Sequence, residues 1–97
     1  MIIRIVKMTF RPEEVTNFLQ VFNASKQYIR TMEGCTHLEL WNDIKAPNIF
    51  FTHSHWQTEN DLNNYRNSEL FKNVWSKTKL LFAEKPEAWS VNNLTSI

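Results

Sequence analysis

The sequence of 97 residues has little of several residue types: one glycine, one cysteine and three prolines. A lone cysteine cannot form a disulfide within the chain, and nothing near Cys35 supplies the paired thiols of a zinc or redox site. A single glycine also excludes a glycine-rich phosphate-binding loop. We therefore expect no disulfide scaffold and a location in the reducing cytoplasm.

Charge of one sign and long apolar runs are equally scarce. Eleven Lys and Arg against ten Asp and Glu leave a net charge of +1, which gives no field to attract a polyanion or an anionic membrane. The longest apolar run is residues 80–83, too short for a membrane span or a secretory signal. We expect no nucleic-acid partner and no membrane association.

What the chain does contain is a regular order of hydrophobic patterns. Residues 2–10 are apolar and β-branched at both alternating positions, which predicts a central strand covered on two sides. Pro12 suits a first helical turn, and the apolar residues that follow recur at helical spacing. This pattern predicts a long amphipathic helix that ends near Gly34, with the glycine as its left-handed cap.

The next segment predicts a β-hairpin. Residues 36–41 and 49–56 alternate between apolar and polar side chains, and the stretch between them contains the Asn, Asp and Pro of a turn. We expect the two strands to pair as neighbours.

The last third predicts two helical segments and a closing strand. Thr58 and Ser68 are suited to cap helices, and Asn67 with Ser68 interrupts the helical pattern between them. The second segment runs to Phe82 and stops before Pro86, and residues 87–94 form the closing strand.

This order of elements predicts a ferredoxin-like βαββαβ unit with a four-stranded antiparallel sheet, in the α+β class. We expect one domain over residues 1–97, because a chain of this length buries only roughly 60–65% of its unfolded surface and builds one small core. Such a unit leaves one face of its sheet without helices. That face must bind a ligand, a nucleic acid or a second copy of the chain.

Several local sequences resemble the antibiotic biosynthesis monooxygenase family of small dimeric α+β barrels. They are residues 32–35 (MEGC) before the second strand, Trp56 at the end of the third, and residues 65–71 (YRNSELF) at the helix break. The resemblance implies a homodimer packed sheet against sheet. It also implies a pocket between helices and sheet, where a phenolic or quinol-like substrate reacts with oxygen without metal, haem or flavin.

Six residues are candidates for binding that aromatic ligand. Thr52 and Trp56 share one face of the third strand with Ser54, and Leu38 and Leu40 of the second strand should join them under the helices. The full set of substrate-binding candidates is Thr52, Trp56, Tyr65, Phe71, Trp75 and Arg4.

Each candidate has a plainer interpretation. The tryptophans and Phe71 could be ordinary core residues, and a buried tyrosine often has only a structural partner. Arg4 interrupts an apolar strand as a possible anchor for an anionic substrate, or extends to water from a strand end. We assign no catalytic residue.

The haem-degrading branch of the resembled superfamily has an axial histidine on the last helix, an asparagine on the first strand and a tryptophan on the short helix. This chain has Trp75, Val6 and Tyr65 at the matching positions. We therefore expect no haem and no other cofactor.

The histidines all lie in the predicted hairpin. If paired positions sum to about ninety-two, His37 faces His55 and Glu39 faces His53. Such a patch could hold a metal ion or form a wet dimer interface; we assign no metal site and favour the interface.

Two other functions compete with an oxygenase. An RNA-recognition fold would stack bases on the third strand, but residues 48–55 lack the glycine and basic residue of its signature. A non-catalytic dimeric binding or stress-related protein of the same fold is the stronger rival, since a cofactor-free oxygenase needs few recognisable catalytic groups.

Overall fold

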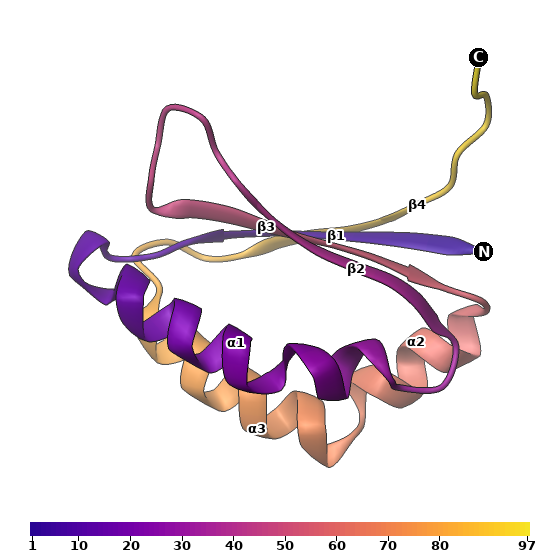
Figure 1. Cartoon of the computed structure of the whole chain (residues 1–97), viewed down its shortest axis with the longest axis horizontal. Coiled ribbons are helices and arrows are strands. Elements are labelled where there is room, and N and C mark those ends of the chain that lie inside the picture. The colour runs from indigo at the N-terminus through magenta and orange to yellow at the C-terminus, as the bar shows by residue number, and fades with distance from the viewer.

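A computed structural model describes all of residues 1–97 as a four-stranded antiparallel sheet with helices on one face (Figure 1). The strands are β1 (Ile2–Thr9), β2 (Cys35–Asn42), β3 (Ile49–Trp56) and β4 (Glu87–Val91), in the spatial order β2-β3-β1-β4. The helices are α1 (Val15–Arg30), α2 (Glu59–Arg66) and α3 (Glu69–Thr78), with short 3-10 turns η1 (Pro12–Glu14) and η2 (Lys79–Leu81). The predicted ferredoxin-like α+β fold is confirmed.

Side-chain caps begin both short helices where the sequence predicts them. The Thr58 hydroxyl accepts a hydrogen bond from the backbone N–H of Asp61 at 3.1 Å, and the Ser68 hydroxyl accepts one from Phe71 at 3.1 Å. Each cap satisfies a backbone donor that the first helical turn leaves free. No helix combines the length and the apolar character that crossing a bilayer requires.

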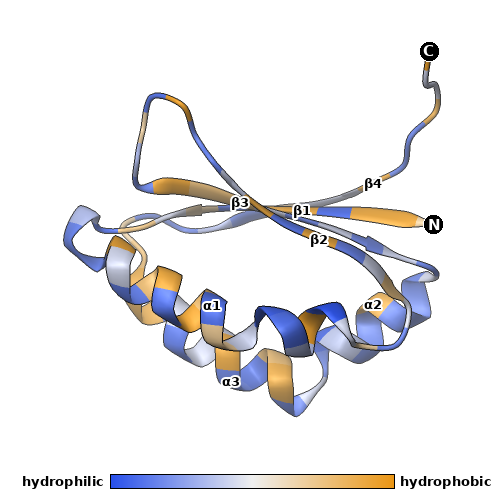
Figure 2. Ribbon diagram, viewed as in Figure 1, coloured by the Kyte–Doolittle hydropathy of each residue, from blue (hydrophilic) through white to orange (hydrophobic).

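The sheet has two unlike faces because successive side chains of a strand point to opposite sides. Met8 and Phe50 point to the helices and pack with Phe18 and Phe22 of α1 in the larger core cluster. In Figure 2, apolar and hydrophilic residues alternate along the helices, as one-sided packing requires. The strand β1 is central, as predicted, but helices cover only one of its faces (Figure 1).

The turn after α1 differs from the prediction. The helix ends at Arg30, where the N–H of Thr31 donates to the carbonyl oxygen of Gln27 and the N–H of Met32 to that of Ile29. Gly34 has the expected positive φ of 83°, but it lies in the turn that leads into β2 and not at the helix cap. The prediction of its conformation is confirmed and that of its place is wrong, because a separate turn is needed to bring the chain back to the sheet.

The closing strand is shorter than predicted. It ends at Val91, which pairs with Ile3 near the start of β1, so almost no partner strand remains for residues 92–94. The C-terminal residues leave the sheet on the side opposite the helices (Figure 1). Strand length here depends on the neighbouring strand and not on local sequence.

We predict that Gly34→Ala destabilises the fold. A side chain at φ 83° is strained by about 1–2 kcal/mol, and the added Cβ would also collide with the Asp61 side chain of α2. Urea denaturation should therefore show a free energy of unfolding that is lower by at least that amount. The exposed Asn64→Ala change in α2 serves as the control, and an unchanged unfolding midpoint for Gly34→Ala contradicts the prediction.

Candidate functional site

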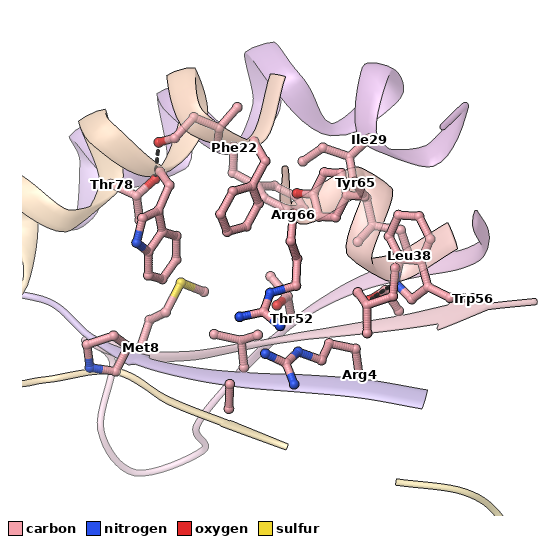
Figure 3. Close-up of a pocket in the computed structure, with 18 of the residues that line it drawn as sticks. Arg4, Met8, Phe22, Ile29, Leu38, Thr52, Trp56, Tyr65, Arg66 and Thr78 are labelled. Atoms are coloured by element: carbon pink, nitrogen blue, oxygen red, sulfur yellow. Dashed lines mark hydrogen bonds between the residues drawn. The ribbon is translucent and has the colours of Figure 1, made fainter. Parts of the chain in front are cut away.

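A cavity of about 320 Å³ lies between the helices and the sheet (Figure 3). All six predicted binding residues line it: Arg4, Thr52, Trp56, Tyr65, Phe71 and Trp75. Thirteen of its 19 lining residues are hydrophobic, and none is Asp, Glu, His, Lys or Cys. The structure thus brings the candidates together; that they bind a ligand stays a prediction.

The sheet positions its share of the lining by register. Arg4 of β1 pairs with Ser54 of β3, and Val6 pairs with Thr52, so these side chains lie on the helix side as neighbours. Leu38 of β2 joins them in the cavity wall. Leu40 is also under the helices, as predicted, but it packs against the larger core cluster outside the cavity.

The helix break positions the opposite wall. Tyr65 and Phe71 are six residues apart, so on one continuous helix they would point about 120° away from each other. Because α2 ends at Arg66 and Ser68 caps a new helix, both rings reach the cavity. Their centroids are 5.2 Å apart in an edge-to-face contact.

An unbroken series of aromatic rings forms this wall. Trp56 stacks on Tyr65 at 4.9 Å, and Phe71 stacks on Trp75 at 5.8 Å. Trp56 is fully buried, and its Nε1–H donates to the Ser54 hydroxyl at 3.0 Å. Trp56 is therefore a core residue that also lines the cavity, and its indole N–H is not free for a ligand because Ser54 accepts that hydrogen.

Tyr65 has a free polar group in this wall. Its hydroxyl forms no hydrogen bond within the chain and points into the cavity (Figure 3). Burial, together with the nearby Cys35 thiol, raises the pKa of Tyr65 well above its usual range. The phenol is therefore neutral at physiological pH, and it can donate a hydrogen bond to a ligand.

Two guanidinium groups face the same space (Figure 3). Arg4 donates one hydrogen bond to the Ser90 hydroxyl at 3.0 Å, and burial followed by the charge of Arg66 lowers its pKa. Arg66 was missed by sequence reasoning, because a basic residue in the last turn of a helix is usually a surface residue. Its only sequence signal is its place next to Tyr65 at the helix break.

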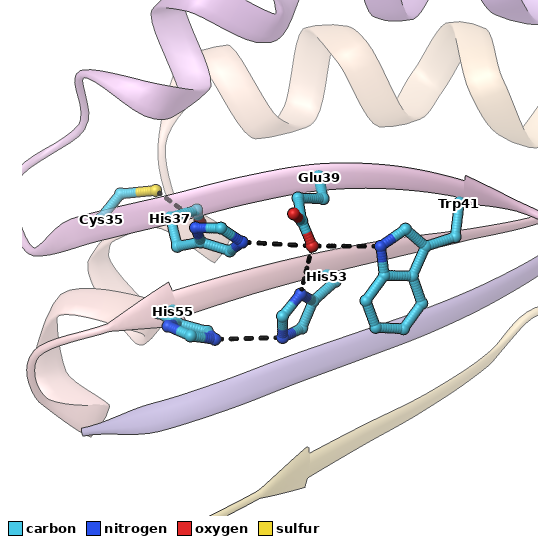
Figure 4. Close-up of polar contacts among 6 residues, drawn as sticks. All are labelled: Cys35, His37, Glu39, Trp41, His53 and His55. Carbon is cyan, nitrogen blue, oxygen red and sulfur yellow. Dashed lines mark hydrogen bonds and ion pairs between the residues drawn. The ribbon is translucent and has the colours of Figure 1, made fainter.

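A polar cluster occupies the helix-free face of the sheet (Figure 4). The predicted register is confirmed: His37 pairs with His55 and Glu39 with His53. One oxygen of Glu39 lies 3.0 Å from His53 Nδ1 and 3.2 Å from His37 Nε2, and it accepts the Trp41 indole N–H at 3.1 Å. These hydrogen bonds, that of His53 first, lower the pKa of Glu39 to about 2.

The ligand atoms of His37, Glu39 and His53 lie within 4.8 Å of one another, which is compatible with a metal ion. Without a metal ion, the same side chains satisfy one another through hydrogen bonds. The imidazoles of His37 and His53 donate to the carboxylate, and the Nε2 atoms of His53 and His55 share a hydrogen bond of 3.0 Å. A bound metal ion would have to displace these shared protons.

The sequence itself identifies the family. A family model described as antibiotic biosynthesis monooxygenase matches residues 1–75. The chain belongs to this family. A comparison with curated proteins found no match to the chain.

Solved structures agree with this antibiotic biosynthesis monooxygenase fold. A structure named antibiotic biosynthesis monooxygenase superposes with a TM-score of 0.92 at 17% identity, covering 98% of this chain and 100% of that one. A conserved protein from Methanosarcina mazei Go1 has a TM-score of 0.88 at 22% identity, over 94% and 91% of the two chains. A Mycobacterium tuberculosis protein has a TM-score of 0.89 at 15% identity, covering 98% of this chain and 96% of that one. At these identities the likeness shows the fold.

We predict that Tyr65 of this family member ionises only well above the usual tyrosine range. The difference in absorbance near 295 nm between the native protein and Tyr65→Phe, followed against pH, isolates its phenolate. The neutral form is favoured in the folded state, so folding stability falls as pH rises above about 10, and it falls less in the variant. Ionisation of Tyr65 in the folded protein at its usual pKa contradicts the assignment.

Proposed function

We propose that this protein is a cofactor-independent monooxygenase that oxidises a small phenolic or quinol-like aromatic in the cavity of about 320 Å³. The observation that supports it most is an apolar, aromatic-lined cavity in which the neutral hydroxyl of Tyr65 is free to bind a substrate oxygen. Family membership supports the same reaction class, since relatives are named monooxygenases.

The proposed reaction converts a phenol and O₂ into a quinone and water. The phenolate transfers one electron to O₂, and the resulting radical and superoxide join through a new C–O bond at the ring carbon. The peroxide takes up a proton, and loss of water cleaves the O–O bond and leaves the second carbonyl. Two hydrogens of the substrate thus leave in the water molecule, with one atom of O₂.

The residues contribute position and electrostatics. No carboxylate, imidazole, amine or thiol lines the cavity, so the chain supplies no general base and the substrate reacts as its own anion. Tyr65 donates to the substrate oxygen, and the positive charge of Arg4 stabilises the anion. The apolar wall of Phe71 and Trp75 orients the ring and excludes water.

We further propose that the helix-free face binds a second copy of the chain. Family members are typically dimers. On this face Trp41, Trp89 and Val91 remain 43%, 44% and 46% exposed, an apolar surface that an identical sheet would cover. This dimer leaves the cavity on the opposite side accessible. We expect it in the cytoplasm, with Cys35 as a free thiol.

Oxygen uptake with a panel of phenols and quinols tests the oxygenase. We predict a rate that increases with pH through the substrate's own pKa, and a loss of about tenfold or more in Tyr65→Phe, which lacks the donor. Trp75→Ala should weaken substrate binding and leave the dimer intact. The exposed Tyr28→Phe is the matched control. No turnover across the panel favours the non-catalytic binding protein.

We also predict that acid weakens the dimer. Burial and the charges of His53 and His37 lower the pKa of His55 on the proposed interface, whereas Glu39 opposes this shift. A dimer interface would bury this imidazole further and disfavour its charged form, so the dimer is at full strength above the usual histidine pKa of about 6.5 and weakens as pH falls below it. Sedimentation should show a dimer at about pH 7.5 and dissociation at about pH 5. The difference between the two pH values should be smaller in His55→Gln. An equally tight dimer at both values rejects the interface.

A further inference from the structure

The cavity contains positive charge that the protein does not neutralise. Arg4 and Arg66 both line it, and their guanidinium groups lie in its central part (Figure 3). The ion pairs of the chain are His37–Glu39, His53–Glu39 and Lys72–Glu69, so neither arginine has a carboxylate partner. Arg66 forms no side-chain hydrogen bond within the chain, and Arg4 uses only one of its donors, toward Ser90.

This arrangement is unfavourable in the empty protein. Two like charges repel each other, and the charge of Arg66 contributes to the lowered pKa of Arg4. Partial burial of Arg4 in an apolar wall adds a desolvation cost that no carboxylate partner offsets. An anion placed between the two groups would remove both penalties.

We propose that the cavity binds aromatic acids, with the ligand carboxylate held between the guanidinium groups of Arg4 and Arg66. This assignment rests on the proposed function, from which it takes the position of the aromatic ring. It adds the substrate class, which is a phenol or quinol that carries a carboxylate. The planar donor fork of arginine matches the two oxygens of a carboxylate. The ring then lies against the Tyr65 and Phe71 side of the cavity.

Size and charge select the same class. About 320 Å³ is at the lower end of the range for small-molecule sites, which suits a ligand of one or two rings. Because the lining has no carboxylate, an acid meets no like charge there, whereas a neutral phenol leaves both guanidinium groups without a counter-ion.

The test uses a matched pair of ligands, 2,5-dihydroxybenzoate and 2,5-dihydroxybenzamide, which share ring and hydroxyls and differ in charge. Titration calorimetry on the native protein should show the acid binding at least about tenfold more tightly than the amide. Arg4→Gln and Arg66→Gln should each remove most of this preference, because each weakens binding of the acid more than binding of the amide. Arg66→Lys keeps the charge without the fork and should give an intermediate value.

Arg11→Gln is the control, because Arg11 lies outside the cavity and donates to the carbonyl of Leu80. It removes one positive charge and should leave the preference intact. Thermal melts verify that each variant folds, and Arg4→Lys replaces Arg4→Gln if the latter does not. Equal affinity for the two ligands, no binding of either, or an unchanged preference in both arginine variants overturns the proposal.

Oxygen uptake separates this inference from the proposed function. A carboxylate preference without turnover supports the arginine pair and rejects the oxygenase. Turnover of neutral phenols with no preference for acids, unchanged in Arg66→Gln, supports the oxygenase and rejects the arginine pair.

Discussion

The alternation of side chains across a sheet that is covered on one face governs this protein. Arg4 and Thr52 share the helix side because β1 and β3 pair in a fixed register, and the same register places His53 and His55 on the open side. A slip of one residue would exchange the two sets. The cavity and the histidine cluster therefore depend on a single constraint, although they lie on opposite faces.

The cavity exists because the small core is divided. One cluster includes Phe10 and Phe18, the latter from α1, and the other includes Trp56 and Leu62, the latter from α2. Between them, aromatic side chains contact one another as a continuous wall and do not collapse into the space. The stack of Trp56 on Tyr65, with the Trp56 indole bonded to Ser54, keeps that wall in place.

Much of the fold could be predicted because its signals are local. Thr58 and Ser68 mark helix starts through hydrogen bonds that span three residues, and the hairpin register follows from strands joined by a short turn. The place of Gly34 could not be predicted so well. Its backbone conformation is local, but its contact with Asp61 comes from packing against α2.

The site residues divide in the same way, into those that local sequence predicts and those whose place depends on tertiary packing. Periodicity placed Thr52, Tyr65 and Trp75 on the sides that meet at the cavity, so these candidates were found. Arg66 was not found, because its cavity-facing position depends on where α2 ends and how α3 turns away. That the indole hydrogen of Trp56 is bonded to Ser54 was equally hidden, since it depends on side-chain geometry between two positions of one strand face.

The amino-acid order alone determined the elements, their sequence along the chain, the pairing of the hairpin and the family, because these depend on periodicity, caps and short-range contacts. Only the tertiary structure decided that α3 and the sheet enclose a cavity, that Arg4 meets Arg66 there without a counter-ion, and that β4 ends at Val91. Those features depend on distances between segments far apart in the chain, which are set when the helices pack on one face of the sheet.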